Sequence, residues 1–164
     1  MRFLKKCNDV LWNGSKYVAI AMYVIMLFTA SLQILMRFIF KSPLAWTDEA
    51  AKYSFVWGTM LGCAILVRTG GHSCVELLGN ALKGTAKKVH AAVLDVCCLV
   101  LYGVVVYGGI VLMQAGATSV SPALSLPMWL VYLIMPISGA FMVLFQLEQL
   151  LRDLVAFRKG EETK

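Results

Sequence analysis

Residues 96–147 read VCCLVLYGVVVYGGIVLMQAGATSVSPALSLPMWLVYLIMPISGAFMVLFQL, 52 residues without a single Asp, Glu, Lys, Arg or His. The core of a soluble domain does not need an uncharged run of this length, whereas a lipid bilayer does. Since about 20 apolar residues of α-helix cross the hydrocarbon, the stretch has room for two crossings and a turn. Its middle, residues 116–127, carries two prolines, and helices tend to end before a proline. The sequence therefore predicts two membrane-spanning helices here.

The rest of the chain contains two further apolar runs, residues 17–36 and 53–67. The first is longer than the apolar part of a cleaved signal peptide and lacks a clear cleavage site, so we expect it to be a retained helix. The chain is 60% hydrophobic and only 15% charged, whereas soluble domains are nearer half apolar and a quarter charged. The predicted fold is an all-α integral membrane protein, a single domain over residues 1–164. Its four expected spans are approximately residues 17–40, 44–68, 89–115 and 126–149.

Lysine and arginine predict the orientation, because these residues accumulate in cytoplasmic segments. The N-terminal segment, the connection between spans two and three, and the C-terminal tail hold 12 of the 15 basic residues. Both termini are therefore expected in the cytoplasm, with two short loops outside. The net charge of +6 follows from this bias, and it indicates contact with anionic lipid head groups rather than with nucleic acid.

The connection between spans two and three contains a second periodic pattern. Apolar residues recur every three or four positions from Val75 to Val89, and three lysines lie away from most of that stripe. This pattern is typical of an amphipathic helix on the inner membrane surface, expected at about residues 74–87. The alternative is a short loop followed by an early start of span three.

The first outer loop is the most informative short segment. Ser42 before Pro43, or Thr47 before two acids, has the form of a helix start. Arg37 is expected to reach Asp48 or Glu49 and to set the angle between spans one and two, while Asp48 and Lys52 have the favourable spacing for a helical ion pair. The alternative is a solvated charge cluster at a helix end. The candidate docking and scaffold residues are Arg37, Trp46, Asp48, Glu49 and Lys52.

Two kinds of feature inside the spans are candidates for helix packing and inner-face contacts. Gly58 and Gly62 lie four residues apart, a spacing that lets two helices approach closely in lipid. Asp95 is the one acid within an otherwise apolar span, and acids inside a membrane are functional candidates by default. It lies near the inner face, where Arg68 or water is expected to reach it. The inner-face polar candidates are Arg68, His72 and Asp95, and Pro136 is expected to kink span four.

Several function classes do not fit these residues. The two histidines lie near the same membrane edge, which is unsuitable for haem across the bilayer, and no group of residues has metal-ligand spacing. The five cysteines avoid both predicted outer loops, which argues against a thiol oxidoreductase. No catalytic constellation is present, so we predict no enzyme, no cofactor and no metal. With few deep polar groups, a subunit that supports a larger partner is favoured over an autonomous small channel or carrier.

The chain resembles the small, DctQ-like membrane subunit of tripartite ATP-independent periplasmic (TRAP) transporters over nearly its whole length. Two residues depart from the pattern after His72, namely Ser73 and Glu76, and Asp48 stands where Glu is commoner. The residues that carry the resemblance are Arg37-Phe38, Ser42-Pro43, Trp46-Thr47-Asp48-Glu49, Gly62, Arg68, His72, Ser121-Pro122-Ala123-Leu124, Pro127, Trp129, Tyr132 and Pro136-Ile137.

The resemblance implies a location in the bacterial cytoplasmic (inner) membrane and two protein partners. A large membrane subunit of roughly twelve helices would form a heterodimer with this chain, carry the substrate and sodium sites, and move one domain as an elevator. A periplasmic substrate-binding protein would deliver an organic acid anion. The small subunit would then enlarge the static scaffold and provide part of the outer docking surface.

Overall fold

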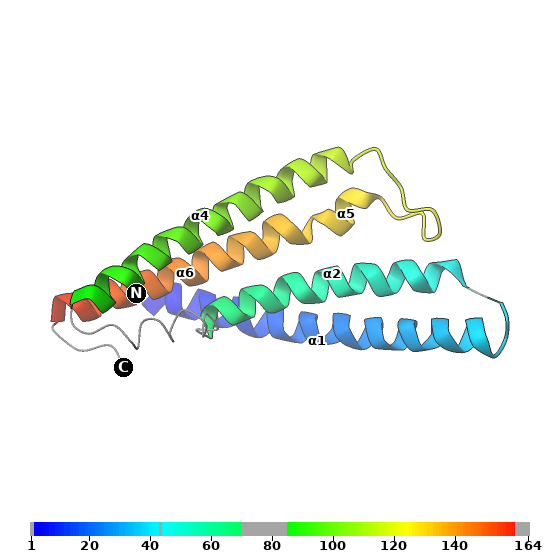
Figure 1. Cartoon of the computed structure of the whole chain (residues 1–164), viewed down its shortest axis with the longest axis horizontal. Helices are drawn as coiled ribbons and strands as arrows, with labels where there is room; N and C mark the ends of the chain where they lie inside the picture. Colours follow the sequence, from blue (N-terminus) through cyan, green and yellow to red (C-terminus); the bar gives the residue numbers. More distant parts are fainter. Residues whose placement is uncertain (1, 43, 70–84, 160–164) are drawn as a thin grey trace.

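The computed structural model describes residues 2–42, 44–69 and 85–159. Within these ranges the chain is helical apart from its short connections and one isolated antiparallel bridge between Val120 and Pro127. Figure 1 shows the helices side by side along one long axis. They are α1 (Arg2–Phe38), α2 (Ala45–Arg68), α4 (Thr85–Ala115), α5 (Met128–Tyr132) and α6 (Ile134–Lys159).

Four stretches of these helices are long and apolar enough to cross a membrane, which confirms the predicted fold class. The stretches are Asn8–Phe38, Ala45–Arg68, Val93–Ala115 and Met128–Leu151. The first begins well before residue 17, because α1 extends into the charged N-terminal segment. Part of the predicted interfacial helix (74–84) and His72 lie outside the described residues, and residues 85–87 belong to α4.

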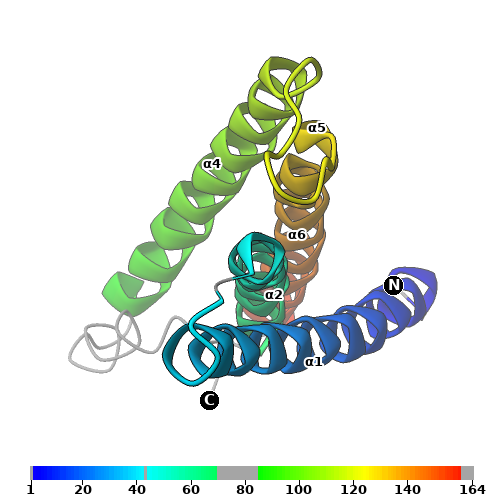
Figure 2. The same ribbon diagram turned by 90° about the vertical axis from the view of Figure 1, so that its right-hand side faces the viewer.

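The spans are arranged with α1 and α4 on the outside and with α2 and α6 between them (Figures 1 and 2). Helix α2 packs against α1 on one side and α6 on the other, and α6 packs against α4. The beginning of α1 and the end of α6 lie at one end of the molecule, which we call the inner end. The α1–α2 connection and the α4–α5 loop lie at the opposite, outer end. The cytoplasmic location of the inner end stays a prediction.

The apolar side chains form a small core and a large exposed surface. Two clusters of buried side chains lie between the central helices and their neighbours: Ala64, Val67, Tyr102, Met142 and Phe145, and Ala19, Leu61 and Ile134. By contrast, long stretches of the outward faces of α1 and α4 carry exposed Val, Leu, Ile, Phe and Tyr. A contiguous apolar surface of this size is unfavourable in water and favourable against lipid or another membrane protein.

The fourth span is interrupted at Leu133, between α5 and α6. Pro136 has no N–H to donate to the Tyr132 carbonyl, four residues earlier, so the helix cannot continue regularly. The expected effect of Pro136 is therefore seen as an interruption of the helix at Leu133, whose backbone stays in the right-handed helical region. The backbone of α4 passes close to this break: a Cβ atom at Gly109 would lie 2.7 Å from Cδ of Pro136 and 2.9 Å from Cβ of Met135.

Candidate functional site

The carboxylate of Glu49 attaches the first turns of α2 to the α4–α5 loop. It accepts hydrogen bonds from the N–H of Ala123 at 3.1 Å, from the N–H of Leu124 at 3.0 Å, and from the hydroxyl of the buried Ser121. Hydrogen bonds to an ionised group are stronger than neutral ones. One acid on α2 therefore orders a loop more than 70 residues away in the sequence.

The neighbouring acid, Asp48, attaches α2 to α1. It forms an ion pair with Lys52 one turn later, and it accepts a hydrogen bond from Nε2 of Gln33 at 3.3 Å. Neither acid is paired with Arg37, so the expectation that Arg37 reaches one of them is wrong. Two ion pairs between described side chains are Lys52–Asp48 and Arg68–Asp9.

The start of α2 does not use the expected side-chain caps. The helix begins at Ala45, and Leu44 at the capping position makes no side-chain hydrogen bond. Instead, the buried Thr47 donates its hydroxyl hydrogen to the Leu44 carbonyl at 2.7 Å. Trp46 is exposed beside this turn, where an indole suits the boundary between lipid and water.

A second polar network lies at the inner end, around Arg68 at the end of α2. Its guanidinium donates to the Asn8 carbonyl at 2.8 Å and pairs with the carboxylate of Asp9, both on α1. It also lies over the rings of Trp12 and Phe145, 5.5 and 5.8 Å from their centroids. The planar cation thus connects α2 to both α1 and α6.

The same network reaches further along α6. Asn8 donates from Nδ2 to Oε2 of Glu148 at 2.6 Å, which joins α1 to α6. Gln146, which is fully buried, donates from Nε2 to Oδ1 of Asp95 at 2.8 Å and joins α6 to α4. Gln146 therefore binds Asp95, whereas Arg68, which together with water was expected to reach Asp95, binds α1.

Sequence reasoning missed Asn8, Asp9, Gln146 and Glu148 as members of this inner network. Gln146 carried a usable signal, because it is one of the few amides in the 52-residue uncharged run. Asn8, Asp9 and Glu148 lie near helix ends, where polar residues are common. Their sequence positions therefore do not indicate a network, and only the structure shows that they belong to one.

The two glycines of α2 face α1. A Cβ atom at Gly58 would lie 3.3 Å from the ring of Tyr23, a contact that is tighter than usual. A Cβ atom at Gly62 would lie 3.8 Å from the Tyr23 hydroxyl, an ordinary contact. Gly58 therefore makes room for the ring of Tyr23, whereas a side chain at Gly62 would make only an ordinary contact with Tyr23.

Taken together, the charged and amide side chains of the two networks join neighbouring elements of the chain. Across the described ranges, no three His, Cys, Asp or Glu residues gather closely enough to hold a metal ion. Glu49, Asp48, Arg68, Asn8 and Gln146 each make a hydrogen bond to another element, and Asp48 is in addition paired with Lys52 within α2. The fold and these contacts define a polytopic helical membrane protein whose helices are joined by polar side chains at both ends.

Comparison with known proteins then identifies the family. Residues 17–156 match the family described as "Tripartite ATP-independent periplasmic transporters, DctQ component". The chain belongs to this family and is a TRAP small permease subunit, a multi-pass protein of the inner membrane.

Individual relatives agree with this family. The chain is 25% identical to the sialic acid TRAP transporter small permease protein SiaQ of Vibrio cholerae, over 90% of this chain and 85% of SiaQ. It is 35% identical to the C4-dicarboxylate TRAP transporter small permease protein DctQ of Rhodobacter capsulatus, over 60% of this chain and 44% of that protein. It is also 27% identical, over 87% of its length, to the isethionate TRAP transporter permease protein DctMQ of Oleidesulfovibrio alaskensis. This match covers only 23% of DctMQ, which is the longer protein.

Proposed function

We propose that this chain is the static small subunit of a sodium-coupled TRAP transporter that imports organic acid anions. It forms a heterodimer with a large membrane subunit, and a periplasmic substrate-binding protein docks on the outer end of the complex. Isethionate, sialic acid and C4-dicarboxylates appear in the names of its relatives, and all three are organic acids. Sodium coupling follows from the family resemblance.

The observation that carries the static role is the use of the polar side chains. Glu49, Asp48, Arg68 and Gln146 bind neighbouring elements of the same chain. A carrier instead needs polar groups that line a route near the membrane midplane. Helices fixed at both ends resist tilting, which suits a frame against which another domain moves.

Each candidate residue has a place in this proposal. The outer group borders the docking surface, and Glu49 also holds the α4–α5 loop. Gly58 and Gly62 serve helix packing, and the inner-face group stabilises the cytoplasmic end. The outer group is Arg37, Trp46, Asp48, Glu49 and Lys52; the inner-face group is Arg68, His72 and Asp95.

The docking role is tested by the double substitution Arg37→Ala and Glu49→Ala in the complete transporter. We expect slower uptake of the organic acid into proteoliposomes, while the binding protein alone keeps its affinity for substrate. Lys16→Ala is the matched control, since Lys16 is an exposed cation of α1 far from the outer end. Normal uptake by a stably assembled double variant would refute the docking role.

The static role is tested separately with the isolated chain in liposomes. We expect no sodium-driven anion flux from this chain by itself, and flux only when the large subunit is present. Flux from the isolated chain would contradict the static role and favour an autonomous channel or carrier.

A further inference from the structure

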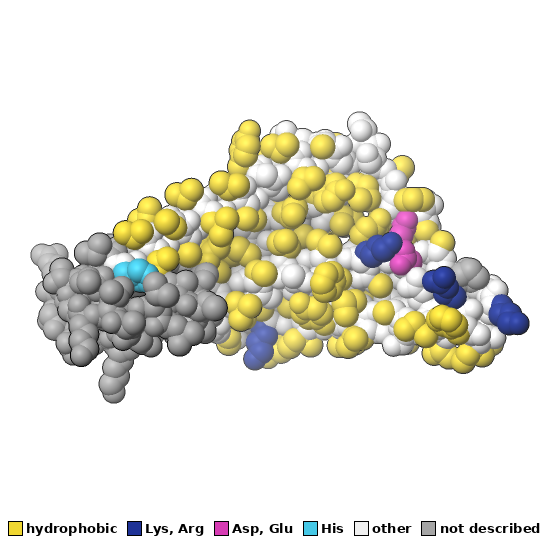
Figure 3. All heavy atoms as spheres, viewed as in Figure 1, with side chains coloured by type: hydrophobic (Ala, Val, Ile, Leu, Met, Phe, Trp, Pro, Cys, Tyr) yellow, Lys and Arg dark blue, Asp and Glu magenta, His cyan; other side chains and the backbone are white. Residues whose placement is uncertain are grey.

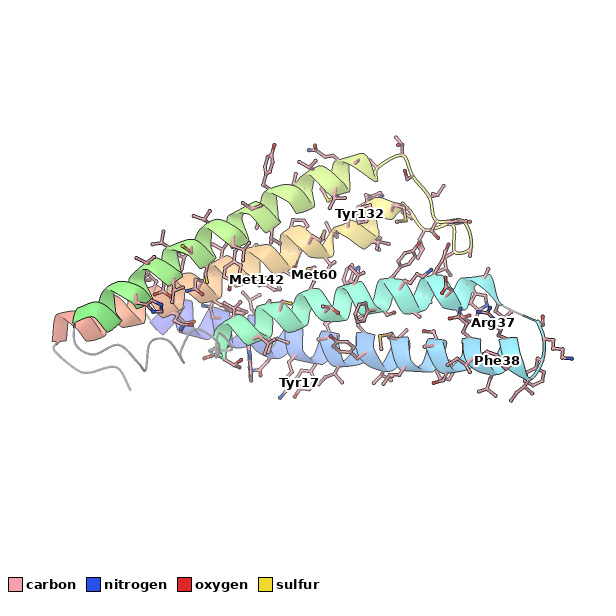
Figure 4. The ribbon with its side chains drawn as sticks, viewed as in Figure 1. Tyr17, Arg37, Phe38, Met60, Tyr132 and Met142 are labelled. Carbon is pink, nitrogen blue, oxygen red and sulfur yellow. The ribbon has the colours of Figure 1, made fainter. Side chains whose placement is uncertain are left out.

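The helices form two hairpins that meet along only part of their length. Helices α1 and α2 form the first hairpin, and α4, α5 and α6 form the second. Figures 1 and 2 show that α5 and the outer part of α4 lie away from α2. Tyr132 of α5, which Figure 4 labels, packs on α4: a Cβ atom at Gly116 would lie 2.8 Å from its ring. In the described part of the chain, α6 is the helix of the second hairpin that packs substantially on the first.

Apolar side chains make this contact at the inner and central levels of α2. Ala64 shares a buried cluster with Met142 and Phe145 of α6. Leu61 shares a second cluster with Ile134, near the start of α6. The two hairpins are therefore held against each other by packing up to the level of Leu61 and its immediate neighbours.

The outer turns of α2 are joined to the second hairpin through the α4–α5 loop. At 1.5 Å of rise per residue, Glu49 lies about 18 Å beyond Leu61 along α2. Its carboxylate accepts hydrogen bonds from the Ser121 hydroxyl and from the N–H groups of Ala123 and Leu124. One side chain thus connects the first hairpin to the tip of a loop that belongs to the second.

The loop is itself a compact unit. Its ends are joined by the N–H of Met128, which donates to the Ser119 carbonyl at 2.9 Å. Its tip is closed by the N–H of Ser121, which donates to the Leu126 carbonyl at 2.9 Å. Ser125 has a φ of 52°, which is uncommon in a residue with a side chain and persists only where surrounding contacts fix the backbone. A loop braced in this way transmits the position of its tip to α4 and α5.

The contact between Glu49 and the loop lies at the outer boundary of the membrane. Irregular backbone is not stable against hydrocarbon, and the exposed Trp46 in the first turn of α2 suits the interface. In Figure 3, most of the charged side chains that are coloured on this face lie toward the outer end, and the surface behind them is mostly apolar. The hairpins are therefore joined by apolar packing within the membrane and by a polar contact at its outer boundary.

We propose that the α4–α5 loop is a strap that fixes the angle between the two hairpins, and that Glu49 closes this strap on α2. The apolar clusters around Leu61 and Ala64 are the pivot. Hydrogen-bond lengths vary by about 0.5 Å, which at about 18 Å from the pivot corresponds to about 2° between the hairpins. The strap keeps the outer end rigid; this inference deepens the proposed static role and rests on it only for its use in transport.

The proposal is tested by double electron–electron resonance on the purified full chain in lipid nanodiscs. Spin labels are attached to introduced cysteines, in a background whose five native cysteines are replaced by alanine. The outer pair of labels replaces Phe38 of α1 and Leu112 of α4, and the inner pair replaces Val10 of α1 and Leu151 of α6. All four side chains are exposed, and each pair reports the distance between the two hairpins at one end of the molecule.

Glu49→Ala is expected to widen the distance distribution of the outer pair roughly twofold and to leave that of the inner pair unchanged, because local opening is confined to the unstrapped end. Tyr53→Phe is the matched control. It removes the hydroxyl that contacts Sδ of Met128 at 3.6 Å, a second polar contact between the hairpins, and it is expected to leave both distributions unchanged. An unchanged outer distribution in Glu49→Ala would overturn the strap, and so would equal widening at both ends, because the hairpins would then have no pivot.

Two milder variants probe the same contact from its two sides. Glu49→Gln keeps the size of the side chain and removes its charge, and Ser121→Ala removes one donor from the loop. Both are expected to widen the outer distribution less than Glu49→Ala does. Wild-type width in both variants would contradict the proposal. Since all of these measurements use the isolated chain, their failure leaves the proposed transport function, which is tested by uptake, intact.

Discussion

Gly109 is the position where the backbone of α4 comes closest to the broken fourth span, and Gly109→Ala tests whether that approach stabilises the protein. The added Cβ would lie 2.7 Å from Cδ and 2.8 Å from N of Pro136. Both atoms belong to a rigid ring attached to the backbone, so they cannot move aside by a change of rotamer. Helices α4 and α6 must separate to accommodate the methyl group.

The expected loss of folding stability in Gly109→Ala follows from two opposing effects. Overpacking of a well-packed contact costs about 1–3 kcal/mol, and replacing Gly by Ala within a helix returns about 0.5–1 kcal/mol. Gly103 and Gly108 lie on the same helix, and a Cβ added at either would meet no atom within 4 Å, so alanine there gives only the favourable effect. We therefore expect Gly109→Ala to be less stable than Gly108→Ala by about 2 kcal/mol, a factor of about 30 in the unfolding equilibrium.

The free energy of unfolding is measured by titration of the purified chain with sodium dodecyl sulfate in mixed micelles, followed by circular dichroism. Comparison of three alanine variants of one helix cancels effects of helix propensity and of the micelle. If Gly109→Ala is as stable as Gly103→Ala and Gly108→Ala, the close approach of α4 to the kink does not exist in the membrane protein.

Two further substitutions test the polar ties. Glu49→Ala is expected to speed hydrogen exchange several-fold at the amide of Ala123, because its acceptor is removed, and less at Leu124, which also donates to the Ser121 hydroxyl at 3.3 Å. Unchanged exchange at Ala123, measured by mass spectrometry, would contradict the contact between α2 and the loop. Arg68→Ala and Asp9→Ala, measured singly and together, are expected to show a coupling free energy of about 1 kcal/mol, since the two side chains are paired; strictly additive losses would argue against the pair.

The four crossings were predictable because the rule behind them is local. A hydrocarbon layer of fixed thickness demands a minimum length of apolar helix, and the runs 17–36 and 96–147 meet that demand for three crossings without reference to any other part of the chain. The run 53–67 is too short by itself and reaches the length of a crossing only when the helix begins near Pro43 or Thr47. The break near Pro136 was predictable for the same reason, since proline alters the hydrogen bonding of its own helix.

The partners of the charged residues were not predictable in this way. Arg37 and Lys52 both lie near Asp48 in the sequence, yet only Lys52 pairs with it. Asp95 has Gln146 as a partner rather than the expected Arg68. Which donor meets which acceptor depends on the relative height and rotation of two helices, and small shifts along the helix axes exchange one partner for another.

The sequence by itself therefore determined that this chain lies in a membrane, how many times it crosses, and where its fourth crossing breaks, because bilayer thickness and backbone chemistry act on each segment separately. Only the tertiary structure decided which helices are central, that the inner and outer ends are joined by different networks, and that Asp48 pairs with Lys52 and Gln33. Those features depend on the register between helices, which is set by side-chain packing over long separations in the chain.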